Sequence, residues 1–300
     1  MTAKMHADER DVDESLVRAL IAARFPQWAE LPLARVRSDG TDNAIYRLGD
    51  DLAVRLPRYP AAAAQPSKEA RWLPHLAARL PLQVPEPLGL GEPALGYPWH
   101  WSVCRWIHGE RASIEAVDPH EAAAQLAAFV RALHEVDPAG GPGPGEHNFA
   151  RGAPLATRDQ EVRAALARLD GVVDVGAAAA AWDRALSAPV WERPGVWVHG
   201  DLQAGNMVVA GGRLRGIIDF GALGVGDPAC DVMTAWIFLP RSVRDVFRAE
   251  AGADEETWER ARGWALSVAL IALPYYRETN PAFFASARRW AEEVLADRDN

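Results

Sequence analysis

The sequence predicts an α+β fold with two lobes, a small one built on an antiparallel sheet and a larger, mainly helical one. Short β-rich segments separated by turn residues fill 33–56, whereas long Ala- and Leu-rich segments with helical spacing begin near 119. A β-rich island at 196–220 interrupts these helices. A chain of 300 residues exceeds the size at which a single core grows comfortably. We therefore expect an N-terminal lobe at 1–107 and a C-terminal lobe at 108–300.

The small lobe is expected to alternate short strands with two helices. Apolar residues at helical spacing predict the first helix, which stops near Pro26. The segments 38–43 and 49–51 are rich in turn formers, so the strands around them should form a meander. In chain order the expected elements are a helix at 11–24, strands at 33–37, 44–48 and 51–56, a helix at 67–80, and strands at 84–90 and 99–105.

The large lobe is expected to be mostly helical because its apolar residues recur every three to four positions. A Pro- and Gly-rich loop at 138–145 separates the first of these helices from the rest. The expected helices lie at 119–136, 158–169, 177–187, 228–239, 255–273 and 281–297.

Composition and charge exclude several classes of protein. The formal charge of -9 argues against nucleic acid or an anionic membrane as a partner. Cys104 and Cys230 are far apart, so they form neither a disulfide framework nor a zinc motif. The N-terminus is charged, and no apolar run approaches the ~18 residues of a membrane span. We expect a globular protein in the reducing cytoplasm.

Three polar side chains lie at the strand ends of the island. Asp201 and Asn206 have the D-x-x-x-x-N spacing, and Asp219 begins a D-F-G element after a Gly-Gly hairpin turn. Phosphoryl transfer needs a carboxylate that orients the attacking hydroxyl and oxygen ligands that hold Mg²⁺ on the phosphates. The pattern therefore predicts Asp201 as the catalytic base and Asn206 with Asp219 as the metal ligands.

These motifs, HGDLxxxN followed by IDFG and GDPxxD, resemble those of the aminoglycoside phosphotransferase family, whose fold is similar to that of protein kinases. The resemblance implies ATP or GTP as phosphoryl donor, with Mg²⁺. It also implies that His199 braces the catalytic loop and that Asp231 supports the loop without touching substrate. Asp227 reads as a helix N-cap before Pro228.

The kinase pattern also needs a cation on the third strand, paired with a helix glutamate. Arg55 occupies that strand position, where most kinases have lysine, and Glu69 is the expected partner on the following helix. Arginine can pair with a carboxylate and neutralise phosphate through its planar fork. Lys68 is the alternative cation.

Two further segments are expected to contact the nucleotide. The turn between the first two strands would let the backbone approach phosphates closely. The segment 102–109 resembles the family hinge, whose backbone groups should bind the purine. The candidate residues are Ser38, Gly40, Thr41 and Asn43 in the turn, and Cys104, Trp106 and Ile107 in the hinge.

The acceptor should be a small molecule, because almost no sequence separates the D-F-G element from the helix at 228–239, where protein kinases insert an activation segment. Trp236, Tyr275 and Glu278 are candidate acceptor contacts. Acidic residues on the C-terminal helices would suit a polyamine sugar, and the aromatic ones would suit a macrolide. Neither set decides between the two.

The leading hypothesis is an O-phosphotransferase acting on an aminoglycoside-type antibiotic. The same fold could instead serve a macrolide or a metabolic alcohol such as choline, homoserine or a sugar. A nucleotide-binding pseudokinase is a further alternative, which the intact set of Asp201, Asn206 and Asp219 disfavours.

Overall fold

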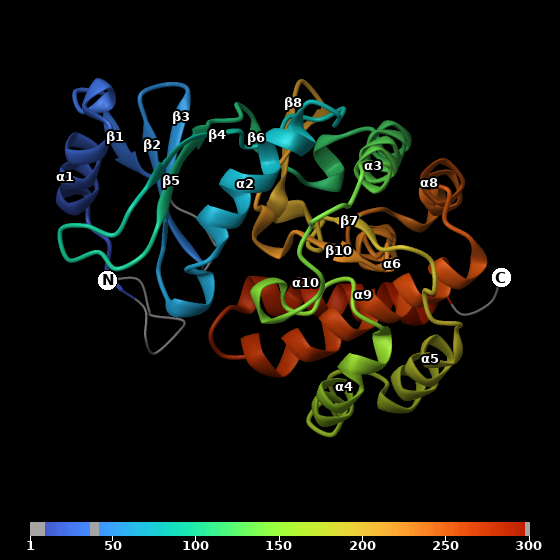
Figure 1. Ribbon diagram of the computed structural model, residues 1–300. Coiled ribbons are helices and arrows are strands. Elements are labelled where there is room, and N and C mark those ends of the chain that lie inside the picture. The colour runs from blue at the N-terminus through green and yellow to red at the C-terminus, as the bar shows by residue number, and fades with distance from the viewer. Residues whose placement is uncertain (1–9, 37–41, 298–300) are drawn as a thin grey trace.

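The computed structural model describes residues 10–36 and 42–297 and has two lobes side by side (Figure 1). The N-terminal lobe contains the main sheet and helix α1, and the C-terminal lobe contains most of the helices, with small strands between them. The predicted two-lobed α+β class is therefore confirmed.

The main sheet has five antiparallel strands in the order β1-β2-β3-β5-β4. β3 lies at its centre, paired with β2 on one side and β5 on the other, so a side chain on β3 is held from both edges. The strands are β1 (Leu33–Arg35), β2 (Asn43–Leu48), β3 (Leu52–Pro57), β4 (Pro87–Gly91) and β5 (Trp101–Arg105).

Helix α1 (Glu14–Arg24) covers one part of this sheet. Asp13 caps it by accepting a hydrogen bond from Leu16 N at 2.8 Å, and its apolar stripe packs against buried strand residues such as Tyr46. The Tyr46 hydroxyl donates to Val12 O at 2.8 Å. The sheet and α1 therefore enclose a core of their own.

The C-terminal lobe packs its helices around the long helix α9. The helices are α3 (Pro119–His134), α4 (Asp159–Leu166), α5 (Val175–Ser187), α6 (Ala229–Val232), α7 (Thr234–Ile237), α8 (Arg244–Ala251), α9 (Glu255–Tyr276) and α10 (Pro281–Ala296). Its strands form two small antiparallel sheets, β6-β8-β9 and β10-β7, from β6 (Glu110–Arg111), β7 (Val196–Val198), β8 (Met207–Ala210), β9 (Arg213–Ile217) and β10 (Gly224–Gly226).

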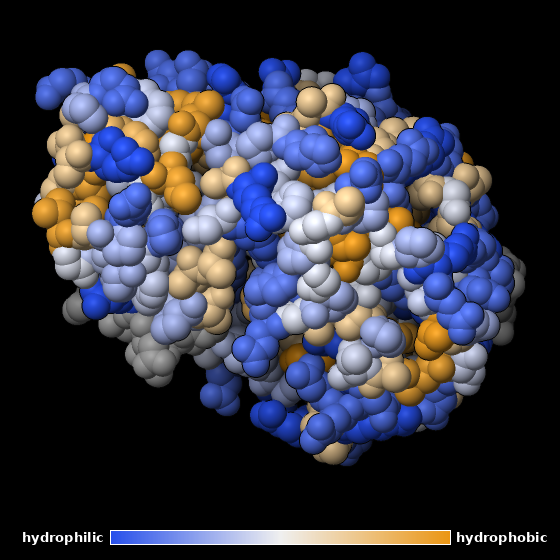
Figure 2. Space-filling model, viewed as in Figure 1, coloured by the Kyte–Doolittle hydropathy of each residue, from blue (hydrophilic) through white to orange (hydrophobic). Residues whose placement is uncertain are grey.

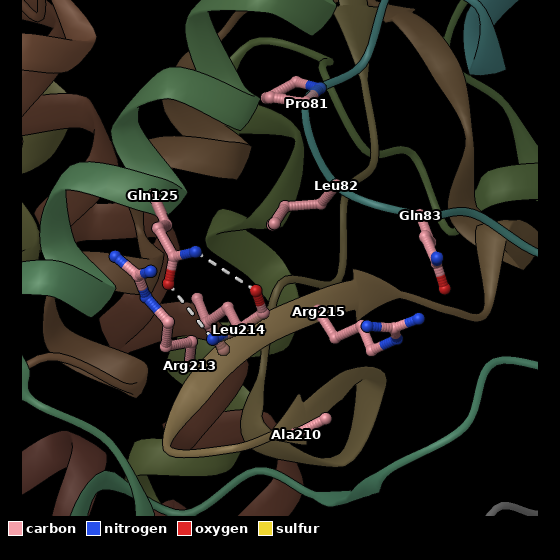
Figure 3. Close-up of a pocket in the computed structure, with 8 residues that line it drawn as sticks. All are labelled: Pro81, Leu82, Gln83, Gln125, Ala210, Arg213, Leu214 and Arg215. Carbon is pink, nitrogen blue, oxygen red and sulfur yellow. Dashed lines mark hydrogen bonds between the residues drawn. The ribbon is translucent and has the colours of Figure 1, made fainter.

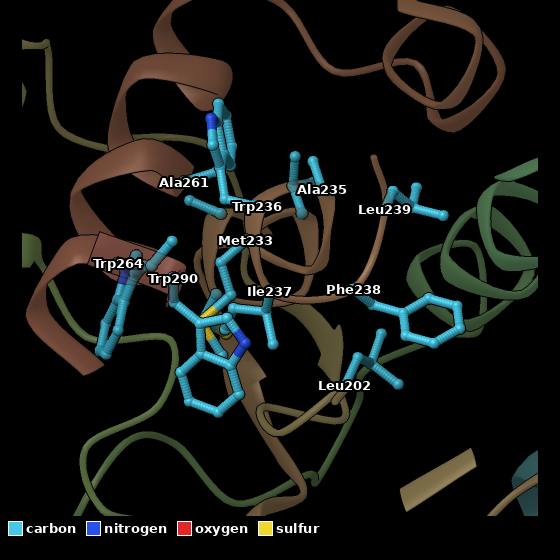
Figure 4. Packing of buried hydrophobic residues seen from close by; sticks show 14 of the residues in the cluster. Leu202, Met233, Ala235, Trp236, Ile237, Phe238, Leu239, Ala261, Trp264 and Trp290 are labelled. Carbon is cyan, nitrogen blue, oxygen red and sulfur yellow. The ribbon is translucent and has the colours of Figure 1, made fainter. Parts of the chain in front are cut away.

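Tryptophans fill much of the larger core. Trp236, Trp264 and Trp290 lie among buried aliphatic side chains of α7, α9 and α10 (Figure 4). Leu202, which directly follows Asp201, is fully buried in the same cluster. The chain next to the predicted catalytic residue is thus anchored in the core.

Helix α2 (Gln65–Ala77) connects the two lobes. By its position in the chain it belongs to the expected N-terminal lobe. However, Leu73 and Leu76 are fully buried in the larger core rather than in the core between the sheet and α1. A lobe boundary at residue 107 stays a prediction.

The clearest difference from the expected elements lies in the segment 228–239. It forms two short helices, α6 and α7, because the chain tightens where Trp236 N donates to Met233 O, a three-residue hydrogen bond at 3.0 Å. Helix α8 was not predicted from the sequence. Its first residue, Arg244, is buried and donates a hydrogen bond to Ala235 O at 2.8 Å. Both features depend on contacts that apolar spacing does not reveal.

The surface visible in Figure 2 is largely hydrophilic, with scattered hydrophobic patches. Within residues 10–36 and 42–297, no helix combines the length and the apolar character that crossing a membrane requires.

A buried ion pair joins α9 to the segment before α6. Arg260 Nε donates to Asp227 Oδ2 at 2.7 Å, and both side chains are 3% exposed. Asp227 also accepts a hydrogen bond from Ala229 N at 3.0 Å, and Arg260 Nη1 donates to Pro189 O at 2.6 Å. The guanidinium of Arg260 therefore holds three segments together, namely α9, the chain around Asp227 and the chain around Pro189.

We predict that Arg260→Leu lowers the free energy of unfolding by about 3–5 kcal/mol, because it leaves the Asp227 carboxylate buried without its partner. The matched control is Arg288→Leu, which breaks the exposed pair between Arg288 and Glu292 and should cost less than about 1 kcal/mol. Urea denaturation measures both. Equal losses in the two variants would contradict the structural importance of the buried pair.

Candidate active site

The loop that follows β7 is held by Asp231. The Asp231 carboxylate is fully buried and accepts hydrogen bonds from His199 N at 2.9 Å and Gly200 N at 2.7 Å. Gly200 has a φ of +81°, and a Cβ there would lie 2.8 Å from the side chain of Arg151. The loop therefore requires glycine at this position and has its shape fixed from α6.

Both ring nitrogens of His199 are used within the protein. Nδ1 accepts a hydrogen bond from Asp201 N at 3.1 Å, so Nε2 carries the proton and donates to Ile218 O at 3.1 Å. The ring is fully buried and contacts Phe220 edge to face, with centroids 4.6 Å apart. His199 thus ties the loop to the end of β9 and has no free nitrogen for proton transfer.

Asp201 and Asn206 lie side by side. Asn206 Nδ2 donates to Asp201 Oδ2 at 2.7 Å and to Asp201 O at 2.9 Å, and Gln203 Nε2 donates to the same carboxylate oxygen at 3.1 Å. Because the amide nitrogen of Asn206 faces Asp201, its amide oxygen faces the other way. Gln203 was not among the predicted site residues.

Asp219 begins the D-F-G element in a strained conformation. Its φ of +64° is unusual for a residue other than glycine, and Oδ1 accepts a hydrogen bond from Arg55 Nη2 at 3.3 Å. The side chain is 40% exposed. Its partial burial raises the pKa of Asp219, with Arg55 opposing that rise and the Glu69 carboxylate adding to it.

Arg55 lies between two carboxylates. Its Nη1 is 2.5 Å from Glu69 Oε2, with side-chain exposures of 10% and 5%, and its Nη2 reaches Asp219. Burial disfavours the charged guanidinium, but Glu69 and Asp219 together outweigh this and raise the pKa of Arg55 above its ordinary value. The predicted pair of Arg55 and Glu69 thus lies in direct contact, and a cation faces the D-F-G aspartate.

Lys68, the alternative cation, binds backbone carbonyls instead of the carboxylates that Arg55 binds. Its Nζ donates to the backbone carbonyls of Gly221 at 2.7 Å and Leu223 at 3.1 Å, and to His147 O at 3.1 Å. Burial lowers the pKa of Lys68 to about 8. Lys68 is therefore hydrogen-bonded to the segment after Asp219 and to His147, whereas Arg55 is the cation that contacts the Asp219 carboxylate.

The turn before β2 is only partly described. Ser38, Gly40 and Thr41 lie outside the described residues, whereas Asn43 is buried and its Nδ2 donates to Gln65 Oε1 at 3.0 Å. Gln65 Nε2 in turn donates to Asp42 Oδ2 at 2.9 Å. The end of the turn is thus tied to α2 through Gln65, a residue that the sequence pattern did not single out.

The predicted hinge begins within β5, which lies between β3 and β4 in the main sheet, and continues beyond the end of that strand. Cys104 is buried and pairs with Ala53 of β3, and Ile107 is also buried. Trp106 N already donates to Asp51 O at 2.7 Å. The Trp106 N–H is therefore already hydrogen-bonded and is not available to a purine. The remaining candidates are the backbone groups of its neighbours in the hinge.

The candidate acceptor contacts lie in different surroundings. Trp236 is 1% exposed, with its ring 4.5 Å from that of Trp258, so it lies in the core instead of facing an open site. Tyr275 is 52% exposed, and Glu278 is exposed in the turn after α9. An acceptor could reach these last two side chains.

Tyr276 is one of the aromatic residues of the C-terminal helices that would suit a macrolide, although it was not among the three candidate acceptor contacts. Burial raises the pKa of Tyr276 to about 12, and Tyr275, Asp42 and Asp201 raise it as well. Its ring lies 4.5 Å from that of Phe283 of α10. The end of α9 therefore brings an aromatic surface within electrostatic range of Asp201.

A surface pocket lies elsewhere, between α3 and the β8–β9 hairpin (Figure 3). Gln125 spans it, donating through Nε2 to Leu214 O at 3.1 Å and accepting from Leu214 N at 3.0 Å. None of the predicted site residues lines it. Gln125 therefore fastens the β8–β9 hairpin to α3, and the pocket lies apart from the candidate active site.

Among the described residues, no group of three His, Cys, Asp or Glu side chains that could hold a metal ion occurs. Mg²⁺ is commonly held by one or two protein oxygens together with substrate phosphates. The Asp219 carboxylate and the Asn206 amide oxygen are hard oxygen donors, so this small set fits a metal that arrives with a nucleotide.

Comparison with solved structures gives three informative matches. The complex of APH(2")-IIia with GDP and kanamycin has a TM-score of 0.71 at 21% identity, covering 94% of this chain and 99% of that chain. Wild-type aminoglycoside 2'-phosphotransferase-IIIa with GDP has a TM-score of 0.72 at 18% identity, covering 96% and 100%. Macrolide 2'-phosphotransferase MphH from Brachybacterium faecium has a TM-score of 0.60 at 22% identity, covering 96% and 100%.

At these identities the matches show a shared fold. Comparison with curated protein sequences gave no match. The sequence model of the phosphotransferase enzyme family matches residues 34–264, a span that contains every motif described above. The resemblance drawn from the HGDLxxxN, IDFG and GDPxxD motifs is thereby confirmed, and the chain belongs to the phosphotransferase enzyme family.

Proposed function

We propose that this phosphotransferase is a magnesium-dependent kinase that moves the terminal phosphoryl group of ATP or GTP onto a hydroxyl group of a small molecule. The observation that carries the proposal is the 3.3 Å contact between Arg55 and Asp219, together with the hydrogen-bonded side chains of Asp201 and Asn206. The two parts are joined where Ile218 N, one residue before Asp219, donates to Asn206 O at 2.8 Å. A phosphate-neutralising cation, a base and metal ligands are the parts that phosphoryl transfer requires.

Asp201 is the proposed base. Hydrogen bonds from Asn206 and Gln203 hold one carboxylate oxygen, Oδ2, and so fix how the other oxygen is presented to an acceptor. That second oxygen would accept the proton of the attacking hydroxyl and align it with the terminal phosphorus. His199 and Asp231 would serve by keeping the loop in this shape.

Asp219 and the amide oxygen of Asn206 would hold Mg²⁺. When bound, the ion neutralises charge on the phosphate oxygens. Arg55 would pair with the phosphates while Glu69 keeps its guanidinium in place. Asn43, the turn before it and backbone groups of the predicted hinge around Cys104 and Ile107 would position the rest of the nucleotide.

Solved relatives support nucleotides and antibiotics as partners. Their complexes contain GDP with kanamycin, ATP with streptomycin, and gentamicin. We propose an aminoglycoside-type antibiotic as acceptor, contacted by Tyr275 and Glu278, and antibiotic resistance as the role. A cytoplasmic location belongs to the same proposal, and Cys104 and Cys230 are both free thiols.

A macrolide is the second candidate acceptor. The rings of Tyr275, Tyr276, Phe283 and Trp290 contact one another in series, with centroids 4.7, 4.5 and 5.5 Å apart. Such an aromatic surface, within electrostatic range of Asp201 at Tyr276, suits a large, partly apolar acceptor. A panel of aminoglycosides, macrolides and metabolic alcohols with radiolabelled ATP or GTP separates the alternatives.

We predict that Asp201→Asn lowers kcat about 10²–10⁴-fold because the base is lost, while MgATP still binds. The measurements are phosphate transfer to the best acceptor, or slow ATP hydrolysis without one, and calorimetric binding of the nucleotide. The control is Asp245→Asn on α8, an exposed aspartate that should retain wild-type turnover. Undiminished turnover in Asp201→Asn would rule out this assignment.

We predict that Asp219→Asn raises the Mg²⁺ concentration needed for half-maximal turnover by at least about tenfold, since a charged ligand becomes neutral. A Mg²⁺ titration at saturating ATP measures this, again with Asp245→Asn as the control. An unchanged Mg²⁺ requirement would mean that Asp219 does not bind the metal.

A further inference from the structure

The ammonium group of Lys68 is surrounded by acceptors from two segments of the C-terminal lobe. Two are the carbonyls of Gly221 and Leu223, at 2.7 and 3.1 Å, just after Asp219. The other two are the carbonyl and Nδ1 of His147, at 3.1 and 3.3 Å. Lys68 itself lies on α2, so one side chain joins three separate parts of the chain.

The tautomer of His147 fits this arrangement. Its Nε2 lies 2.9 Å from Gly143 O, and a carbonyl can only accept, so Nε2 carries the proton. Nδ1 therefore presents a lone pair to Lys68. All four neighbours of the ammonium accept hydrogen bonds, which is the environment that a positive charge requires.

Lys68 is one of three polar residues that α2 directs at the active site. Gln65 and Glu69 lie three positions before it and one position after it, so the three side chains occupy neighbouring parts of one helix surface. Gln65 binds the end of the turn at Asp42, and Glu69 binds Arg55. Lys68 is the member of this set that reaches the segment following Asp219.

The contact also continues to the catalytic loop. Asn148, next to His147, is fully buried, and its Nδ2 donates to Arg151 O at 3.1 Å. Arg151 Nε then donates to Gly200 O at 2.7 Å, one residue before Asp201. A continuous path of hydrogen bonds and short backbone therefore runs from α2 to both carboxylate-bearing segments.

We propose that Lys68 is a positioning residue that holds the segment after Asp219 and the 145–151 loop against α2, and thereby sets the distance between Arg55 and Asp219. The inference rests on the kinase function proposed above. Lys68 acts through Gly221, Leu223 and His147 and touches neither nucleotide nor acceptor.

Removing the ammonium would leave its acceptors without their shared donor, and the backbone of the D-F-G element would shift to satisfy them. The helix itself would stay docked, because Leu73 and Leu76 remain buried in the larger core. The expected defect is therefore in binding of the metal–nucleotide complex rather than in folding.

The test compares Lys68→Met with Arg71→Met, a control that removes an exposed cation from the same helix. Lys68→Met should raise the Kd for MgADP and the KM for MgATP about tenfold, the scale seen when a partner that orients metal ligands is lost. The acceptor KM should change little, and Arg71→Met should behave as wild type. Wild-type nucleotide constants in Lys68→Met would overturn the inference.

Hydrogen–deuterium exchange of the ligand-free proteins gives a readout independent of activity. Lys68→Met should speed amide exchange in the peptides that contain 219–225 and 145–151, and His147→Ala, which removes one acceptor, should do so to a smaller extent. Unchanged exchange in both variants overturns the inference even if the enzyme is active. A wild-type protein that binds no MgADP instead overturns the proposed function, and with it the role of Lys68 in nucleotide binding.

Discussion

The guanidinium of Arg55, buried between the carboxylates of Glu69 and Asp219, links the main sheet, helix α2 and the D-F-G element at one point. A buried charge of this kind is stable only with partners, and removal of one partner from a buried pair typically costs about 3–5 kcal/mol. Each of the three segments is therefore constrained by the other two. The relative positions of the residues in the candidate active site depend on this constraint.

The loop that carries Asp201 is held in a similar way, by a buried carboxylate that binds backbone amides. Asp231 accepts hydrogen bonds from the backbone amides of His199 and Gly200. His199 in turn joins the end of β9 to the loop that carries Asp201. Polar groups buried with satisfied hydrogen bonds hold one arrangement strongly, since any shift leaves them unpaired. Asp201 and Asp219 are half-buried and can meet ligands, whereas their supports His199 and Asp231 are fully buried.

The sequence predicted the α+β class, the family and most strands because these follow from spacing and contiguous motifs. The proximity of Arg55 and Glu69 followed from the kinase pattern, whereas the partners of Lys68 are backbone carbonyls more than 70 residues away that leave no signature. Trp236 illustrates a second limit. Spacing places an aromatic residue on a helix, but which helix face is buried depends on tertiary packing that one sequence does not encode.

The central claim is that Asn206 and Asp219 hold a divalent ion against the phosphates of a nucleotide beneath Arg55. The most direct measurement is a crystal structure with a non-hydrolysable ATP analogue and Mn²⁺, located by its anomalous scattering. The account predicts a Mn²⁺ peak bonded to the Asp219 carboxylate, the Asn206 amide oxygen and phosphate oxygens. A nucleotide bound away from Arg55, or a metal with neither side chain as a ligand, would contradict it.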